Sequence, residues 1–294
     1  MEFRDSQRAV APITVAVLLV AGLVVATLGT TPTRLGAEEI LAQARAPGEP
    51  AFVAGHRGDS TAAPENTIPA VAAAISAGYD YVEVDVALTA DGHPVLIHDK
   101  KVDRTTNGTG LVADLTLAEI RSLDAGEWFS AEFAGTRVPT LVEFLDVIGS
   151  AEHRAMIELK GPWTDVAVEY LVEEIERRGL ERSVILSSFD ASTLGMVAAE
   201  SSVISRLANL RRLPEDVAAL AQAIGVHGVV ANGEAVLEHP EFVEDARAAG
   251  LRIVLYTFNR DKQWQAALDL GVDGIVTDTP AELATWLDGV EAAE

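Results

Sequence analysis

Cysteine is absent from this 294-residue sequence, and basic residues are few. The lack of cysteine excludes disulfide bonds, thiolate metal sites and a cysteine nucleophile. Lysine and arginine total 22 against 45 aspartate and glutamate residues, which gives a formal net charge of −23. Nucleic acids and anionic lipid surfaces are bound by clustered lysine and arginine, so this balance argues against both as partners. An anionic small substrate has to be met by a few local cations.

The N-terminal residues 9–30 carry no charge and are mostly Val, Leu, Ala and Ile. About 20 apolar residues span a bilayer core of roughly 30 Å, whereas a cleaved signal peptide has an apolar region of about 7–15. The sequence therefore predicts an uncleaved transmembrane signal anchor at residues 9–30, with residues 1–8 in the cytoplasm and the rest of the chain outside. Arg4 and Arg8 favour this orientation. Cleavage would instead give a secreted protein, and a buried core helix is the remaining alternative.

Residues 31–50 are rich in Pro, Gly, Glu and Arg, which indicates a linker, and residues 51–294 hold the main domain. In this domain short apolar runs alternate with helical patterns, and residues 99–139 interrupt the alternation as an insertion, helical near 116–123. The apolar runs lie at 51–55, 80–86, 154–159, 183–187, 203–207, 226–231, 252–256 and 273–277. The helical patterns lie at 67–77, 140–149, 164–178, 190–199, 214–224, 240–249, 260–270 and 280–287. Eight strands that alternate with helices predict a parallel sheet closed into a (β/α)8 TIM barrel, and an open doubly wound sheet is the alternative.

One further strand-like segment, residues 94–98, follows the second strand too closely for a parallel connection, which needs about a dozen residues or more. It is therefore predicted to return antiparallel, as a hairpin extension of that strand. Asp91-Gly92 is a favoured two-residue hairpin turn. A turn centred there places His98 opposite Asp85, with both side chains on one face of the hairpin.

Polar side chains cluster where the predicted strands end, which is the working face of a parallel barrel. Glu83 and Asp85 lie two residues apart on the second strand and share a face, and Glu158 is near the end of the third. Burial of such carboxylates is unfavourable unless a cation neutralises them. Three carboxylates with water form an oxygen site suited to Ca²⁺ or Mg²⁺. His56 and His98 lie beside these carboxylates and are candidates for proton transfer.

The motifs HRG, PENT, EVD, HD, DRTTNGTG, IELK, SSFD and GVDGIVTDTP occur in this order across residues 52–287. Together they resemble the glycerophosphodiester phosphodiesterase family, although each motif alone is a weak signal. The resemblance implies a (β/α)8 barrel with a small insertion and a divalent metal ion. It also implies hydrolysis of glycerophosphodiesters to sn-glycerol 3-phosphate and an alcohol.

Carried over motif by motif, the resemblance implies roles for eight residues. Glu83, Asp85 and Glu158 would be the metal ligands, and His56 and His98 would carry out acid–base catalysis. Arg57 and Lys160 would bind the phosphate, and Glu65 would take part directly or through a neighbouring residue. Our hypothesis from the sequence assigns the leaving alcohol to His98 and the attacking hydroxyl to His56, and the reverse assignment stays open. The attacker is either water or the glycerol hydroxyl of the substrate. Tyr256 departs from the family, which commonly has tryptophan there, and this bears on the alcohol side of the substrate pocket.

Two other functions are compatible with the sequence. A phospholipase D-like barrel acting on lysophospholipids or sphingolipids would need an apolar entrance within residues 99–139. An inactive, membrane-tethered binding barrel would lack a metal ligand or a histidine, and none is missing. A sugar-phosphate isomerase on the same fold is disfavoured, because paired histidines with three carboxylates fit phosphodiester cleavage better. The sequence thus predicts a membrane-anchored, metal-dependent phosphodiesterase with an extracytoplasmic catalytic domain.

Overall fold

A computed structural model describes residues 45–291 and contains one nine-stranded sheet. The strands are β1 (Phe52–Gly55), β2 (Tyr81–Leu88), β3 (Pro94–Leu96), β4 (Ala155–Leu159), β5 (Val184–Ser188), β6 (Ser205–Leu210), β7 (Gly228–Asn232), β8 (Arg252–Tyr256) and β9 (Gly274–Thr277). All strands except β3 pair in parallel with their neighbours, and β1 pairs with both β2 and β9. The sheet is therefore closed, and the predicted TIM barrel is confirmed.

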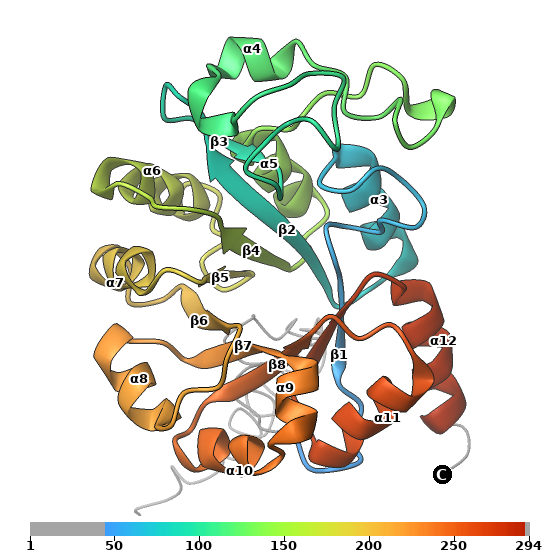
Figure 1. The fold of residues 1–294 in the computed structure, drawn as a ribbon, viewed down its shortest axis with the longest axis vertical. Helices are drawn as coiled ribbons and strands as arrows, with labels where there is room; N and C mark the ends of the chain where they lie inside the picture. Colours follow the sequence, from blue (N-terminus) through green and yellow to red (C-terminus); the bar gives the residue numbers. More distant parts are fainter. Residues whose placement is uncertain (1–44, 292–294) are drawn as a thin grey trace, which may run out of the picture. The chain divides into compact units, whose positions relative to one another are not determined.

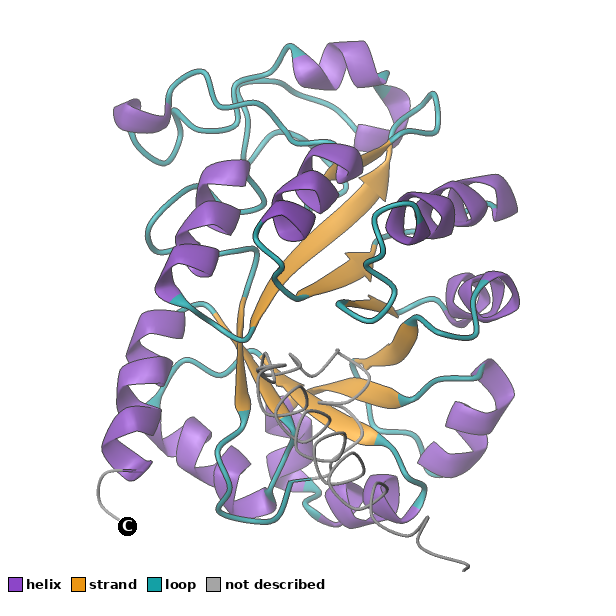
Figure 2. Ribbon diagram, turned by 180° about the vertical axis from the view of Figure 1, so that it is seen from behind, coloured by secondary structure: helices purple, strands orange, loops and turns teal. Residues whose placement is uncertain are grey.

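Helices surround the ring of strands in both views (Figures 1 and 2). They are α3 (Ile68–Ala77), α4 (Leu117–Arg121), α5 (Leu141–Ser150), α6 (Asp165–Glu176), α7 (Ala191–Glu200), α8 (Val217–Ile224), α9 (Gly233–Glu238), α10 (Glu241–Ala248), α11 (Asp261–Leu270) and α12 (Pro280–Glu291). The short α9 is the one helix in the barrel repeats that the sequence pattern did not predict. A capping box of Thr140 and Glu143 opens α5, and the Asp190 side chain caps α7.

The core has two layers because successive residues of a strand point to opposite faces. On β2, Val82, Val84 and Val86 pack outward against the helices, whereas Tyr81 joins a cluster inside the barrel. The inner cluster consists of Phe52, Ala54, Tyr81, Met156, Ile185, Leu207, Val230, Val254 and Val276. Glu83 follows Tyr81 on the inward face, so the barrel interior is apolar below and becomes polar toward the carboxyl ends of the strands.

The hairpin after β2 differs from the prediction by one residue. Val86 pairs with Leu96 and Leu88 with Pro94. The Thr89 amide also donates to the His93 carbonyl at 3.0 Å, which leaves a three-residue loop at 90–92. Gly92 ends this loop at a left-handed φ of 80°, the conformation that a three-residue hairpin loop requires. The predicted two-residue turn at Asp91-Gly92 is therefore wrong. Asp85 lies opposite Ile97, whose amide donates to the Asp85 carbonyl at 3.0 Å, and His98 comes after the pairing ends.

The insertion at residues 99–139 has a small hydrophobic cluster of its own. It contains α4 and two 3-10 turns, Val112–Asp114 and Ala131–Phe133. Its cluster is formed by Val95, Ile97, Val102, Val112, Ile120, Ala125 and Val138, so the insertion packs on the β2–β3 hairpin. Figure 1 shows α4 beyond the end of β2, and the helix predicted near 116–123 is confirmed.

The predicted anchor at residues 9–30 lies outside the described residues, together with residues 1–8 and most of the linker. Within residues 45–291, none of the helices has both the length and the apolar character needed to cross a membrane. The end of the linker runs along the barrel, where the Gly48 amide donates to the Leu268 carbonyl at 2.9 Å.

Candidate active site

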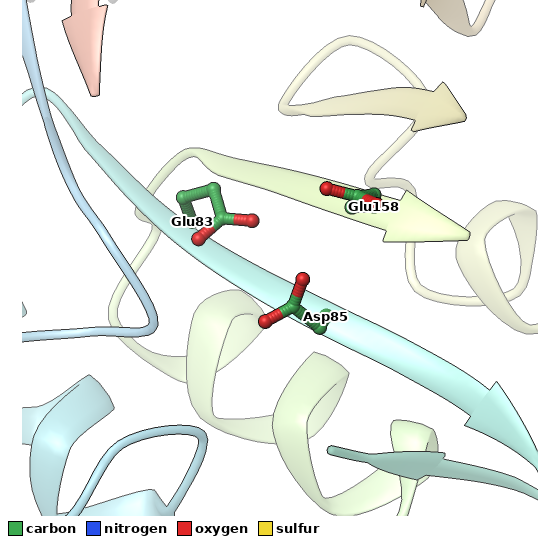
Figure 3. Close-up of side chains that lie close together, drawn as sticks. All are labelled: Glu83, Asp85 and Glu158. Carbon is green, nitrogen blue, oxygen red and sulfur yellow. The ribbon is translucent and has the colours of Figure 1, made fainter. Parts of the chain in front are cut away.

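Three acidic side chains converge at the carboxyl end of the barrel. Glu83 and Asp85 come from β2, and Glu158 comes from β4, where it is the direct register partner of Asp85 (Figure 3). One carboxylate oxygen from each lies within 4.8 Å of the others. The structure therefore brings the three predicted ligands together, and ligation itself stays a prediction.

Burial and mutual repulsion of the carboxylates in this cluster favour the binding of a cation. Burial first, and then the charge of Asp85, raise the pKa of Glu83 to about 7, and the same two causes raise the pKa of Glu158. Burial also acts to raise the pKa of Asp85, but Lys160 and other nearby cations outweigh it, so this pKa is lowered. Lys160 Nζ lies 2.7 Å from Glu158 Oε1 and 3.1 Å from Asp85 Oδ1. The carboxylate oxygens of Glu83, Asp85 and Glu158 are hard donors, and such donors fit Ca²⁺ or Mg²⁺.

The loop between β1 and α3 holds Asp85 in place from the other side. Arg57 Nε lies 3.3 Å from Asp85 Oδ2, and Asn66 Nδ2 donates to the same oxygen at 2.9 Å. Arg57 and Asn66 have φ of 61° and 56°, a strained region for non-glycine residues that is concentrated at functional sites. At Gly58 φ is 89°, and a Cβ would lie 2.6 Å from the Ala70 carbonyl carbon. Only glycine fits there without a shift of the backbone.

His56 is held by a carboxylate from the opposite end of the domain sequence. Its Nδ1 lies 2.5 Å from Oδ1 of Asp278, which follows β9, and Asn259 donates to the other Asp278 oxygen at 2.8 Å. Burial lowers the pKa of His56, but the hydrogen bond with Asp278 and the charge of Glu83 outweigh it, so the pKa is raised. With Nδ1 bonded to Asp278, Nε2 is the ring nitrogen available for proton transfer.

His98 has a similar arrangement within a longer ionic network. Its Nδ1 lies 2.7 Å from Asp99 Oδ1, and Arg104 donates from Nε to Asp99 Oδ2 at 2.7 Å. Arg104 also binds both Glu65 oxygens, at 2.7 and 2.8 Å, and Arg57 Nη1 donates to Glu65 at 2.7 Å. Burial lowers the pKa of His98 more than Asp85 and Asp99 raise it. Glu65 thus ties the insertion to the HRG loop.

A cavity of about 270 Å³ lies at this end of the barrel. Its lining residues are His56, Arg57, Glu83, His98, Met156, Glu158, Lys160, Ser187, Phe189, Asn209, Arg211, Val230, Tyr256, Thr257 and Val276. Both histidines, both predicted phosphate-binding cations and two of the three carboxylates therefore face one cavity. Asp85 and Glu65 are not among the lining residues, and each lies behind them in ion pairs.

Sequence reasoning assigned no role to four residues that hold this site together. They are Asn66, Asp99, Arg104 and Asp278. Each lies inside a motif that carried the family resemblance, respectively PENT, HD, DRTTNGTG and GVDGIVTDTP. Their presence in those motifs was the only available signal, because their partners become neighbours only in the folded barrel.

A closed parallel barrel with carboxylates and carboxylate-bound histidines on one cavity defines a (β/α)8 enzyme equipped for acid–base chemistry. A sequence model described as the glycerophosphoryl diester phosphodiesterase family matches residues 56–282. A glycerophosphodiester phosphodiesterase of Caldanaerobacter subterraneus subsp. tengcongensis is 40% identical over 240 residues, which cover 79% of this chain and 96% of the relative. The chain belongs to the glycerophosphoryl diester phosphodiesterase family, an enzyme family, which confirms the resemblance found in the motifs.

Two solved structures extend this comparison to the fold. A phosphodiesterase of Oleispira antarctica, determined in complex with the product sn-glycerol-3-phosphate, is 28% identical with a TM-score of 0.71 and covers 81% of this chain and 96% of its own. A glycerophosphodiester phosphodiesterase of Agrobacterium tumefaciens is 30% identical with a TM-score of 0.68, covering 80% of this chain and 100% of its own. Both relatives match across nearly their whole length.

Proposed function

We propose that this enzyme hydrolyses glycerophosphodiesters to sn-glycerol 3-phosphate and an alcohol. The observation that carries the proposal is a cluster of three carboxylates beside one cavity, whose lining includes two of them, two cations and both histidines. The names of its relatives, and the product found in the Oleispira antarctica phosphodiesterase, support the same substrate class.

In this proposal Glu83, Asp85 and Glu158 hold a divalent cation, Ca²⁺ or Mg²⁺. A phosphodiester is anionic and resists nucleophiles, and a bound divalent cation supplies charge neutralisation at its phosphoryl oxygens. Arg57 and Lys160 line the same cavity and would add positive charge at the phosphate. Glu65 would act through Arg57, which it binds at 2.7 Å, instead of touching the phosphate itself.

The surroundings of the two histidines favour the reverse of the assignment hypothesised from the sequence. His98, with its lowered pKa, is suited to accept a proton on Nε2 from the attacking hydroxyl as that oxygen bonds to phosphorus. His56, with its raised pKa, is suited to donate a proton to the alkoxide as its bond to phosphorus breaks. A nearby divalent cation would lower both pKa values, and the hydrogen bond with Asp278 would still favour the protonated form of His56. A cyclic glycerol phosphate in single-turnover experiments would identify the substrate hydroxyl, and not water, as the attacker.

The experiment that tests the proposal uses the full-length protein with glycerophosphocholine and glycerophosphoethanolamine, in Ca²⁺, Mg²⁺ or chelator, and measures release of glycerol 3-phosphate. We expect release that depends on the metal and is lost in Glu158→Gln. Glu173→Gln, an exposed change on α6, is the matched control and should keep activity. No release from either diester under any metal would overturn the proposal.

Two alternatives fit the geometry less well. A phospholipase D-like enzyme was expected to have an apolar entrance within residues 99–139, yet no described residue of that segment lines the cavity. An inactive binding barrel would not need both histidines bonded to carboxylates, as His56 and His98 are. The hydrolase is therefore the better account of the site.

We also propose, from the sequence, that residues 9–30 anchor the protein in the membrane with the barrel on the extracytoplasmic side. The support is the uncharged apolar stretch preceded by Arg4 and Arg8. Added protease should degrade the barrel in intact cells stripped of any outer envelope. Protection of the barrel until the membrane is lysed would show the opposite location.

A further inference from the structure

The wall of the cavity formed by β5, β6 and β8 carries a cation that the proposed mechanism does not use. Arg211 follows β6, and its Cζ lies 4.1 Å from the centroid of the Phe189 ring. Tyr256 meets the same ring edge-on at 6.2 Å and donates from its hydroxyl to the Leu210 carbonyl at 3.1 Å. The guanidinium is thus stacked on an aromatic platform, which leaves the N–H groups at its edge free to bind a ligand.

Arg211 differs from the other cavity cations in its charge balance. Arg57 is paired with Glu65 and Asp85, and Lys160 is paired with Glu158 and Asp85. Among residues 45–291, Arg211 has neither a carboxylate partner nor a hydrogen-bond acceptor, although it lines the cavity. Its positive charge is therefore available to an anion in the substrate.

Asn209 provides a second unused group on the same wall. It lies on β6 two residues before Arg211 and also lines the cavity. The residue is 7% exposed, and its side-chain oxygen is buried without a donor among the described residues. An unpaired buried oxygen is unfavourable, so a ligand N–H or O–H at this point would be stabilised.

We propose that Arg211 and Asn209 bind the alcohol part of the diester and select head groups that carry an anion beside a hydrogen-bond donor. The inference rests on the proposed function and adds a head-group preference to it. The glycerol part of a glycerophosphodiester is neutral and common to all these substrates. The unpaired guanidinium of Arg211 therefore discriminates among them through the charge of the alcohol head group. Choline has no N–H group to donate to Asn209, and its positive charge is repelled by Arg211. It also cannot stack on Phe189, because the Arg211 guanidinium already covers the face of that ring. Serine offers an ammonium group next to a carboxylate and fits both side chains.

The experiment compares glycerophosphoserine with glycerophosphoethanolamine, because these two diesters differ only in the head-group carboxylate. The full-length enzyme is expected to have a higher kcat/KM for the serine diester and its lowest value for glycerophosphocholine. Arg211→Gln should lower the ratio of serine to ethanolamine by about tenfold, as expected for loss of a charge-assisted hydrogen bond. Arg212→Gln is the matched control, because Arg212 is exposed like Arg211 but lies outside the cavity lining, and it should leave the ratio unchanged.

The outcomes separate this inference from the proposed function. An unchanged serine-to-ethanolamine ratio in Arg211→Gln, with hydrolysis intact, overturns the head-group preference and leaves the proposed function standing. An equal loss for all three diesters also overturns it, because Arg211 would then act on the phosphate they share. Absence of hydrolysis of every diester by the unmodified enzyme, with either metal, overturns the proposed function and the preference together.

Discussion

Replacing Asp278 by asparagine removes the charged partner of His56 while keeping a side chain of nearly the same size. Asp278 Oδ1 lies 2.5 Å from His56 Nδ1, and this contact is the largest effect that raises the pKa of His56. The neutral amide stabilises the imidazolium form less than the carboxylate does. We therefore expect the pKa of His56 to fall in Asp278→Asn.

The size of the fall follows from the exposure of the pair. A hydrogen bond to a charged group contributes about 1.5–3 kcal/mol, and one pKa unit corresponds to about 1.4 kcal/mol. The Asp278 side chain is 48% exposed and that of His56 is 18% exposed, so solvent screening places the effect at the lower end of this range. The expected decrease is about one pH unit.

The assay is the pH profile of kcat/KM for glycerophosphoethanolamine at saturating metal. If His56 is the acid, the alkaline limb of the profile reports its pKa and should move down by about one unit, while the acidic limb stays in place. Activity at alkaline pH then falls, because less of His56 is protonated.

Asp99→Asn is the matched control, because it makes the same change beside His98, where Asp99 Oδ1 lies 2.7 Å from Nδ1. It should move the acidic limb to lower pH. Exchange of the two effects, with Asp278→Asn moving the acidic limb, would refute the assignment of acid and base. Movement of neither limb would refute the view that these carboxylates set the pKa values of the histidines.

Three further predictions concern the frame of the site. Arg104→Lys should lower kcat about tenfold with little change in KM, because lysine cannot bind Glu65 in bidentate fashion, and steady-state kinetics would contradict this if KM rose instead. Gly58→Ala should lower the free energy of unfolding in urea by about 2–4 kcal/mol, because the new Cβ clashes with the Ala70 backbone. At Gly92 a Cβ would meet no atom within 4 Å, so Gly92→Ala should lower it by only about 1–2 kcal/mol. Equal losses in the two variants would argue against the clash. Calorimetry should detect Ca²⁺ or Mg²⁺ binding that Glu158→Gln weakens at least tenfold, and unchanged affinity would remove that residue from the ligand set.

Both histidines are hydrogen-bonded to a carboxylate, but their pKa values are shifted in opposite directions. Nδ1 is bonded in both, to Asp278 in one and to Asp99 in the other, so both leave Nε2 for the substrate. The pKa is raised at His56 and lowered at His98, because His56 gains more from its carboxylate and from Glu83 than it loses by burial. Opposite shifts of this kind separate an acid from a base at one pH.

The sequence by itself determined the barrel and most of the charged side chains and histidines that line the cavity. Strand and helix periodicities are properties of neighbouring residues, and so is the shared face of Glu83 and Asp85, which needs only the two-residue repeat of a strand. The carboxyl-end location of Glu158 and Lys160 followed from their place at the end of a predicted strand.

Only the tertiary structure decided how these groups are connected. Asp278 reaches His56 across 222 residues because closure of the barrel places β9 beside β1. The three-residue loop that ends at Gly92 set the register of the hairpin, which a turn motif alone had misplaced by one residue. Contacts between residues far apart in the chain depend on the path of the whole backbone, so no local pattern could have predicted them.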